Sequence, residues 1–213
     1  MRPFNLLQIT DCHLGSQPGE KLLGLDTDQS LHDVLACAQE NEQPDLVLAT
    51  GDISNDGGVA SYERFTQIVK QYFPSVPLAW LPGNHDDPEN MDLVTELPIE
   101  AHMFVEGWNL IFLDSRIPMQ EGGNLNAAEL VRLESELQAH IDDPTMIFLH
   151  HQPVPVESAW VDEYVVKNSD EFFGIVDRYE NIKAISWGHI HQEFLNSRQG
   201  VQLFATPSTC VQF

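Results

Sequence analysis

Polar clusters rich in metal-binding side chain types follow directly on short apolar runs at five places in the chain. The clusters are Asp11-Cys12-His13, Gly51-Asp52, Gly83-Asn84-His85-Asp86, His150-His151 and Gly188-His189-Ile190-His191. In open α/β sheets, functional side chains collect in the loops beyond the carboxyl ends of the strands. We therefore expect all five clusters to meet at one edge of a sheet.

The side chains in these clusters suit divalent cations. Carboxylate and imidazole groups bind manganese, iron and zinc, whereas the absence of cysteine ligands argues against a structural zinc site. Asp11 and His13 stand at i and i+2, as do His189 and His191, so each pair projects from one side of an extended segment. Each pair can therefore reach the same centre.

Asp52 is the candidate for a ligand shared between two ions, because a carboxylate has two oxygens and can bridge ions about 3.5–4 Å apart. Asn84 would add a neutral oxygen. Gly51, Gly83 and Gly188 allow tight turns and close approach of the backbone.

Each cluster alone has an ordinary explanation. A single Asp-X-His is usually a surface accident, Gly-Asn-His-Asp is a plausible turn, and a His-His pair can be a satisfied polar group in a core. Their occurrence in order, each at the end of an apolar run, favours a metal centre over chance.

The elements that must position these clusters alternate between strand and helix. Continuous apolar runs predict strands, and apolar residues at i, i+3, i+4 and i+7 predict helices. Strands are expected at 4–9, 46–50, 78–81, 146–149, 182–187, 194–197 and 201–205, and helices around 31–38, 62–72, 126–141 and 170–179. Residues 101–114 read as a hairpin with Glu106-Gly107 at its turn. Asn126 is the candidate N-cap of its helix, with Glu129 three residues on.

This alternation predicts an α/β domain with helices outside a largely buried sheet. The 213 residues fit a single domain, 1–213, with no linker-like or repeated stretch.

Composition excludes some functions. With 33 acidic and 10 basic residues, the formal charge is −23, which argues against binding nucleic acid through basic patches. No run approaches the roughly 18–20 apolar residues of a membrane span. Three widely spaced cysteines and an N-terminus without a signal-like apolar stretch predict a cytoplasmic protein.

In their order and spacing the five clusters resemble the calcineurin-like metallophosphoesterase superfamily, over nearly the whole chain from Leu7. The resemblance implies a four-layer αββα sandwich of two mixed β-sheets flanked by helices. It also implies the ligands of two ions. One ion would be held by Asp11, His13, Asp52 and His191, and the other by Asp52, Asn84, His150 and His189.

His150 and His151 compete for one ligand position. The 39-residue interval from His150 to His189 resembles the spacing of the superfamily, so His150 is the expected ligand. His151 would then support it or face the substrate.

Two ions can lower the pKa of a bridging water and produce hydroxide near neutral pH. His85 and Asp52 are therefore the expected catalytic residues, with His85 donating to the phosphate or the leaving oxygen. Alternatively, His85 only orients Asp11 or Asp52. The resemblance implies substrate contacts from His13, Asp52, Asn84, His85 and His191. Asp86 is expected to orient His85 or to cap a turn.

Within the superfamily, the chain most resembles the bacterial class III cyclic-nucleotide phosphodiesterases. This likeness is carried by the segments 7–11, 51–57, 113–115, 188–193 and 205–213. It implies hydrolysis of 3',5'-cyclic AMP to 5'-AMP with two divalent ions, iron or manganese, and it leaves a homo-oligomer possible. The alternatives are a broader phosphodiesterase, for example one acting on glycerophosphodiesters, and a non-catalytic interaction scaffold of the same fold.

Two departures from that subgroup stand out. Gln152 replaces the proline or small residue common after the histidine pair. The chain also stops at Phe213, where relatives continue, so part of the substrate cover and of the oligomer contacts is expected to be missing.

Overall fold

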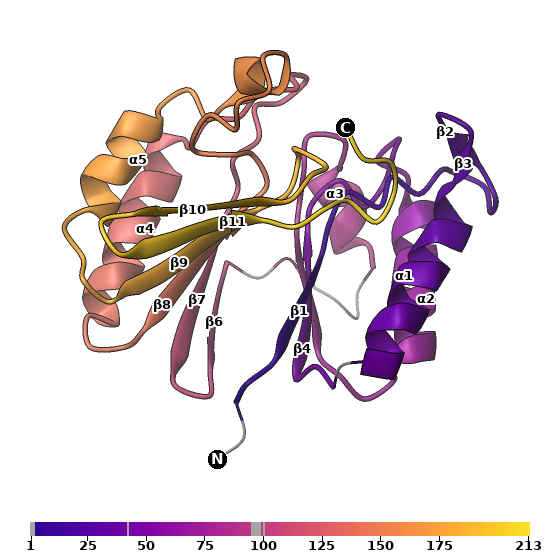
Figure 1. The fold of residues 1–213 in the computed structure, drawn as a ribbon, viewed down its shortest axis with the longest axis horizontal. Helices are drawn as coiled ribbons and strands as arrows, with labels where there is room; N and C mark the ends of the chain where they lie inside the picture. Colours follow the sequence, from indigo (N-terminus) through magenta and orange to yellow (C-terminus); the bar gives the residue numbers. More distant parts are fainter. Residues whose placement is uncertain (1–2, 42, 95–98, 100) are drawn as a thin grey trace.

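In the computed structural model, which describes residues 3–41, 43–94, 99 and 101–213, two β-sheets face each other and helices cover their outer sides (Figure 1). The smaller sheet has the order β1-β4-β5, and its strands are parallel. They are β1 (Leu6–Ile9), β4 (Leu46–Thr50) and β5 (Leu78–Leu81).

The larger sheet has the order β10-β11-β9-β8-β7-β6. Its strands are β6 (His102–Val105), β7 (Trp108–Leu113), β8 (Thr145–Leu149), β9 (Ile182–Trp187), β10 (Phe194–Arg198) and β11 (Val201–Ala205). The four inner strands β7, β8, β9 and β11 are parallel, and the two edge strands are antiparallel to them.

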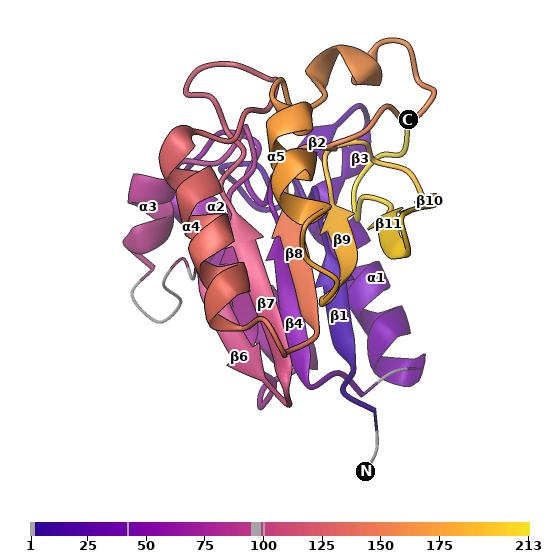
Figure 2. The same cartoon turned by 90° about the vertical axis from the view of Figure 1, so that its left-hand side faces the viewer.

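Helices α1 (Thr27–Asn41) and α2 (Val59–Tyr72) cover the smaller sheet, and α4 (Ala127–Ala139) and α5 (Ser169–Val176) cover the larger one (Figures 1 and 2). The αββα sandwich is confirmed. The larger sheet is mixed as expected, whereas the smaller sheet is all-parallel within the described residues. No helix of the described chain is both long and apolar enough to cross a membrane.

Three apolar cores correspond to the three interfaces between the four layers. Along β4, successive side chains point to opposite faces. Leu46 and Leu48 therefore join the core between the sheets, while Val47 and Ala49 join the core under α1 and α2. This arrangement explains why β4 reads as continuously apolar in the sequence.

The hairpin and the helix cap predicted from sequence are confirmed. Glu106 and Gly107 both have positive φ, 50° and 82°, which a two-residue turn of the type I′ kind requires. The side chain of Asn126 accepts hydrogen bonds from the amides of Ala128 at 2.9 Å and Glu129 at 3.0 Å. The Glu129 carboxylate does not complete a reciprocal box but accepts from the amide of Asp114.

A partly buried polar bridge joins the two sheets directly below the carboxyl ends of their strands. Gln8 on β1 donates to the Thr50 hydroxyl at 2.9 Å, and it accepts from the Ser186 hydroxyl on β9 at 2.6 Å. Since these bonds link three strands from both sheets, they fix the relative height of the loops that follow.

Four short elements were not predicted. They are β2 (Lys21–Leu22), β3 (Leu25–Asp26), α3 (Pro88–Asp92) and the 3₁₀ helix η1 (Val161–Tyr164). Each is too short to show a periodic pattern.

Candidate metal centre

The loops after β1, β4, β5, β8 and β9 gather at one end of the sandwich, where the C-terminus also lies (Figures 1 and 2). Three of these strands belong to the smaller sheet and two to the larger one. The loops are tied to each other by their backbones: Asp11 N–H donates to Gly51 at 3.0 Å, and Gly188 N–H to His150 at 3.1 Å. All seven residues predicted as ligands are thereby brought to one place.

Five of these seven residues have left-handed backbone conformations, with φ between 46° and 64°. They are Asp11, His13, Asp52, His189 and His191. A non-glycine residue in such a conformation costs on the order of 1–3 kcal/mol and persists only where the surrounding structure enforces it. The strained backbone at these five positions therefore lowers the stability of the fold.

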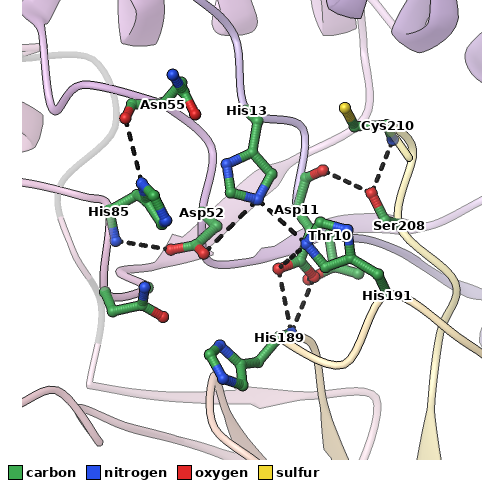
Figure 3. A network of polar contacts seen from close by, with 12 residues as sticks. Thr10, Asp11, His13, Asp52, Asn55, His85, His189, His191, Ser208 and Cys210 are labelled. Carbon is green, nitrogen blue, oxygen red and sulfur yellow. Dashed lines mark hydrogen bonds and ion pairs between the residues drawn. The ribbon is translucent and has the colours of Figure 1, made fainter. Parts of the chain in front are cut away.

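On one side of the centre, four side chains converge (Figure 3). The Nε2 atoms of His13 and His191 are 3.1 Å apart. Nε2 of His191 lies 3.4 Å from Oδ1 of Asp11, and Nε2 of His13 lies 3.7 Å from Oδ2 of Asp52. Asp11 is held by the Thr10 hydroxyl at 2.6 Å and by the amide of His189.

On the other side, Nε2 of His150 lies 3.3 Å from Oδ2 of Asp52 and 3.1 Å from Oδ1 of Asn84. The ring of His189 crosses that of His150 with centroids 5.2 Å apart. Oδ2 of Asp52 therefore faces both halves, while its Oδ1 accepts from the amide of His85 at 2.9 Å. This is the geometry required of a shared ligand.

The tautomers fit a metal centre. Nδ1 of His150 donates to the Thr50 carbonyl at 2.8 Å and Nδ1 of His191 to the Val211 carbonyl at 2.7 Å, so in the neutral form of each ring Nε2 presents a lone pair inward. Lone pairs and buried carboxylates pointing at one another repel unless a cation or a proton lies between them. Ligand atoms around an ion with bonds of about 2.1 Å lie roughly 3–3.5 Å apart, close to the distances found.

His151 is differently engaged. Its Nδ1 is 2.8 Å from the Ser115 hydroxyl, and its Nε2 is 3.1 Å from the Glu121 carbonyl. Because the Ser115 oxygen also accepts from the backbone amide of His151, its proton is free to go to Nδ1. Both ring nitrogens of His151 thus have hydrogen-bond partners within the protein. One of them nevertheless lies within 4.8 Å of a ring nitrogen of His150 and of one of His189. This supports His150 as the ligand, while the ligand set as a whole stays a prediction.

Charges in the centre are strongly coupled. Burial alone would raise the pKa of Asp52, but the charge of His150 and its hydrogen bond hold that pKa well below the usual value. Burial would lower the pKa of His150, yet Asp52 raises it to about 9. Burial and the charge of His150 lower the pKa of His189 to about 4. Without metal, the Asp52–His150 pair therefore carries one proton at neutral pH.

His85 is exposed at the rim of the centre, with its ring 4.9 Å from that of His13. Nδ1 of His85 is 3.2 Å from the Asn55 carbonyl, which leaves Nε2 free (Figure 3). Among the described residues, the side chain of His85 forms no hydrogen bond with Asp11 or Asp52, although one of its ring nitrogens lies within 4.8 Å of an Asp52 oxygen. Its backbone amide donates to Asp52. The expected role of His85 toward substrate stays a prediction.

Asp86 ties two ligand loops together. Its carboxylate accepts from the amides of Ile53 at 3.2 Å, Ser54 at 3.0 Å and Gly83 at 2.9 Å, and from the Tyr62 hydroxyl at 3.1 Å. Asp86 thus holds the turn after β5 against the turn after β4, the cap-like role expected, and its side chain makes no contact with His85 among the described interactions.

Neighbouring atoms approach Gly83 and Gly188 so closely that neither position has room for a Cβ. A Cβ on Gly83 would lie 2.2 Å from Oδ1 of Asp52, and a Cβ on Gly188 would lie 2.1 Å from the Thr10 hydroxyl oxygen. Any larger residue would displace the carboxylates of the centre.

A pocket of about 280 Å³ opens over the centre, and one wall of it was not foreseen from the sequence. His13, Asp52, Asn84, His85, His189 and His191 form its floor. Asn55, Glu121 and the buried Val161 also line it. The mainly apolar part of its lining consists of Leu22, Leu23, Trp160, Tyr164, Val211 and Phe213. Trp160 and Phe213 are each about half exposed, at 51%. We call these six residues the apolar wall.

The chain is similar in sequence to known phosphoesterases. The calcineurin-like phosphoesterase family matches residues 4–193. A 3',5'-cyclic-nucleotide phosphodiesterase of Nostoc sp. (strain PCC 7120) is 41% identical over 217 residues, covering 99% of this chain and 80% of the relative. The 3',5'-cyclic adenosine monophosphate phosphodiesterase CpdA of Pseudomonas aeruginosa is 39% identical, covering 98% of this chain and 77% of the relative.

Among solved structures, a dimetal phosphatase from Danio rerio superposes with a TM-score of 0.70 at 14% identity, covering 97% of this chain and 88% of that one. At this identity the likeness concerns the fold alone.

The contacts of His150 and His151 lead to a direct test. His150→Gln should lower the number of ions bound per chain, because it removes an Nε2 aimed at Asp52. His151→Gln should keep the full number, although it costs stability by removing a buried hydrogen-bonded ring. Elemental analysis of both purified variants decides between them. Loss of metal from the His151 variant with retention in the His150 variant would reverse the assignment.

The raised pKa of His150 predicts how metal binding depends on pH. A metal ligand must be deprotonated, so binding at pH 7 should release a proton from His150, and affinity should rise by up to about tenfold per pH unit toward pH 9. The metal-free protein should behave oppositely. Its stabilisation from the charged ring is complete below about pH 6.5 and is lost as the pH rises through about 9.

Calorimetric titration in two buffers of different ionisation enthalpy measures the released proton, and thermal melts of metal-free protein follow the loss of stability. Equal affinity at pH 7 and pH 9 would contradict the role given to His150.

Proposed function

The chain belongs to the calcineurin-like phosphoesterase family, and from this premise we propose that it hydrolyses 3',5'-cyclic AMP to 5'-AMP at the centre described above. The proposed substrate rests on the sequence identity of 39–41% to cyclic-nucleotide phosphodiesterases over 98–99% of the chain. The centre adds a complete set of predicted ligands, which a non-catalytic scaffold would have no need to keep.

Two divalent ions fit this centre. We propose Asp11, His13, Asp52 and His191 for one, and Asp52, Asn84, His150 and His189 for the other. When bound, such ions neutralise phosphate charge and make a water molecule more acidic. The oxygen and nitrogen ligands accept several metals, and iron or manganese remains our proposal for their identity.

The protein's own groups would orient the substrate. Asn84, His13 and His191 border the floor of the pocket, where the phosphate would lie. His85 faces the same space with Nε2 free, so it can donate a proton to the 3' oxygen as the ester bond breaks. The Asn55 carbonyl accepts from Nδ1–H, so Nε2 donates this proton when the ring is in its imidazolium form and accepts one when the ring is neutral.

The apolar wall supports a nucleotide rather than a small phosphate ester. Phe213 lies parallel to the ring of His191 with centroids 4.2 Å apart, and the ring of Trp160 meets Phe213 edge-on at 4.8 Å. The half-exposed faces of these rings border the same pocket as the floor residues, so a base can stack there while the phosphate occupies the floor.

The second candidate is a phosphodiesterase of broader specificity, because much of the pocket lining beyond the metal centre is apolar or aromatic, with Asn55 and Glu121 as polar residues. The predictions of a cytoplasmic location and of a homo-oligomer are untested by these observations and remain proposals.

The proposed activity predicts a defined substrate order. With added manganese or iron, 3',5'-cyclic AMP should be hydrolysed in preference to 2',3'-cyclic AMP, cyclic GMP, glycerophosphodiesters and an aryl phosphodiester. Asp52→Asn should lower kcat/KM by more than about a hundredfold, beyond the effect of residues that only orient a ligand. Product release is followed by chromatography.

Asp142→Asn, an exposed change of the same chemistry, serves as the control and should leave activity intact. An aryl diester hydrolysed as well as cyclic AMP would favour the broader enzyme, and AMP release that resists a chelator would sink the metal proposal.

The apolar wall predicts a split between substrates. Stacking of a base on an aromatic ring contributes about 1–3 kcal/mol, so Trp160→Ala should raise KM for cyclic AMP about fivefold or more. Dimethyl phosphate is a small phosphodiester without a base, so its KM should change little in the same variant. Leu195→Ala, an exposed apolar residue on β10, is the control. Equal effects on both substrates would show that Trp160 does not contact the base.

A further inference from the structure

A second cluster of metal-ligand side chains lies on the outer side of the larger sheet, between its edge strand β6 and helix α4 (Figure 1). It consists of His102 at the start of β6 and of Glu136 and His140 at the end of α4. Within the described residues, none of the three borders the pocket over the catalytic centre. We propose that this cluster is a separate mononuclear site for a transition-metal ion of the zinc type.

The spacing of the helical pair suits a shared ion. Glu136 and His140 stand at i and i+4. His140 directly follows α4 as its C-cap, and its backbone amide donates to the Glu136 carbonyl at 3.1 Å, which keeps the two residues one turn apart. His102 comes to them from the neighbouring strand, with its ring centroid 5.1 Å from that of His140. One ligand atom from each residue lies within 4.8 Å of the others. Bonds of about 2.0–2.2 Å require the ligand atoms to lie roughly 3–3.5 Å apart, so binding would draw the three side chains closer together.

His140 is prepared for this role by its own support. Its Nδ1 is 3.0 Å from Oδ2 of Asp143, which leaves Nε2 as the lone pair available to an ion. A carboxylate behind a histidine is the usual arrangement at protein metal sites. Asn181 donates to the carbonyls of His140 at 2.9 Å and Asp143 at 3.0 Å, so this loop is held in place.

Neither ring nitrogen of His102 has a hydrogen-bond partner among the described residues. Its Nδ1 faces Glu136 but lies 3.9 Å from Oε2, too far for a hydrogen bond. Its Nε2 is buried and also has no partner. An ion between His102 and Glu136 would take the Nδ1 lone pair and leave Nε2 as the N–H.

The ligand chemistry selects the ion. Two imidazoles and one carboxylate suit zinc, cobalt, nickel or copper, and not magnesium or calcium, which prefer oxygen ligands alone. The side chains of the three residues are about one quarter exposed, at 25–28%, so an ion can enter from solvent and keep water in its remaining position. The net charge of −23 favours any cation. An ion bound here would fasten the edge strand β6 to α4.

The test counts ions and measures stability in the full chain. Metal-stripped protein is titrated with zinc, freed of excess ions and analysed for bound zinc. The wild type should retain one ion more per chain than His102→Gln/His140→Gln and than Glu136→Gln. Zinc should also raise the melting temperature of the Asp52→Asn variant, whose catalytic centre is impaired, and this rise should be lost when Glu136→Gln is added.

Glu134→Gln is the matched control, since it removes the same charge from the same helix. The Glu134 carboxylate is more exposed than that of Glu136 and pairs with Arg178 at 2.8 Å. It should bind as much zinc as the wild type. Cyclic AMP hydrolysis with manganese should be equal in the wild type and in all of these variants except those carrying Asp52→Asn, which separates this site from the proposed activity.

Equal zinc content in the wild type and in Glu136→Gln would overturn the proposal, as would an undiminished rise in melting temperature. Should the double histidine variant fail to fold, Glu136→Gln alone decides, because it preserves the size of the side chain and both imidazoles.

Discussion

The structure depends on one electrostatic constraint: two buried carboxylates and several imidazole lone pairs point at a common volume. Asp11 and Asp52 are 0% and 2% exposed, and the nearest imidazole nitrogens of His13 and His191 are 3.1 Å apart. Burying such groups without a cation costs more than folding can usually supply. In metal-free protein the proton shared by Asp52 and His150 offsets part of this cost, and bound ions would offset it more completely.

The rest of the architecture serves this convergence. Left-handed backbone at five predicted ligands costs stability, and Gly83 and Gly188 leave no room for a Cβ. The four donors to the Asp86 carboxylate hold the loops in place. The compensation lies in three apolar cores, one at each layer interface. The polar bridge through Gln8 then sets the height at which the two sheets present their loops.

The sequence predicted the strands and the gathering of the five polar clusters, because a buried parallel strand and the loop beyond it leave a local signature. The hairpin at Glu106-Gly107 and the cap at Asn126 were also predictable from sequence, since both are determined by a few neighbouring residues. The apolar wall was not, because Leu23, Trp160 and Phe213 are far apart in the chain and meet only in the fold. The engagement of both nitrogens of His151 likewise depends on Ser115 and Glu121, some thirty residues away. Glu136 and His140 form a visible helical pair, but His102 joins them from another element.

The division of the centre between two sheets also bears on how the protein matures as it leaves the ribosome. Asp11, Asp52 and Asn84 emerge with the smaller sheet, but His150, His189 and His191 follow only with the larger one. The segment after β11 then holds the loops in place, as the Ser208 hydroxyl donates to the Asp11 carbonyl and the Val211 carbonyl accepts from Nδ1 of His191. A nascent chain that ends before His191 therefore lacks the complete set of predicted ligands, and binding of both ions must follow the synthesis of strands from both sheets.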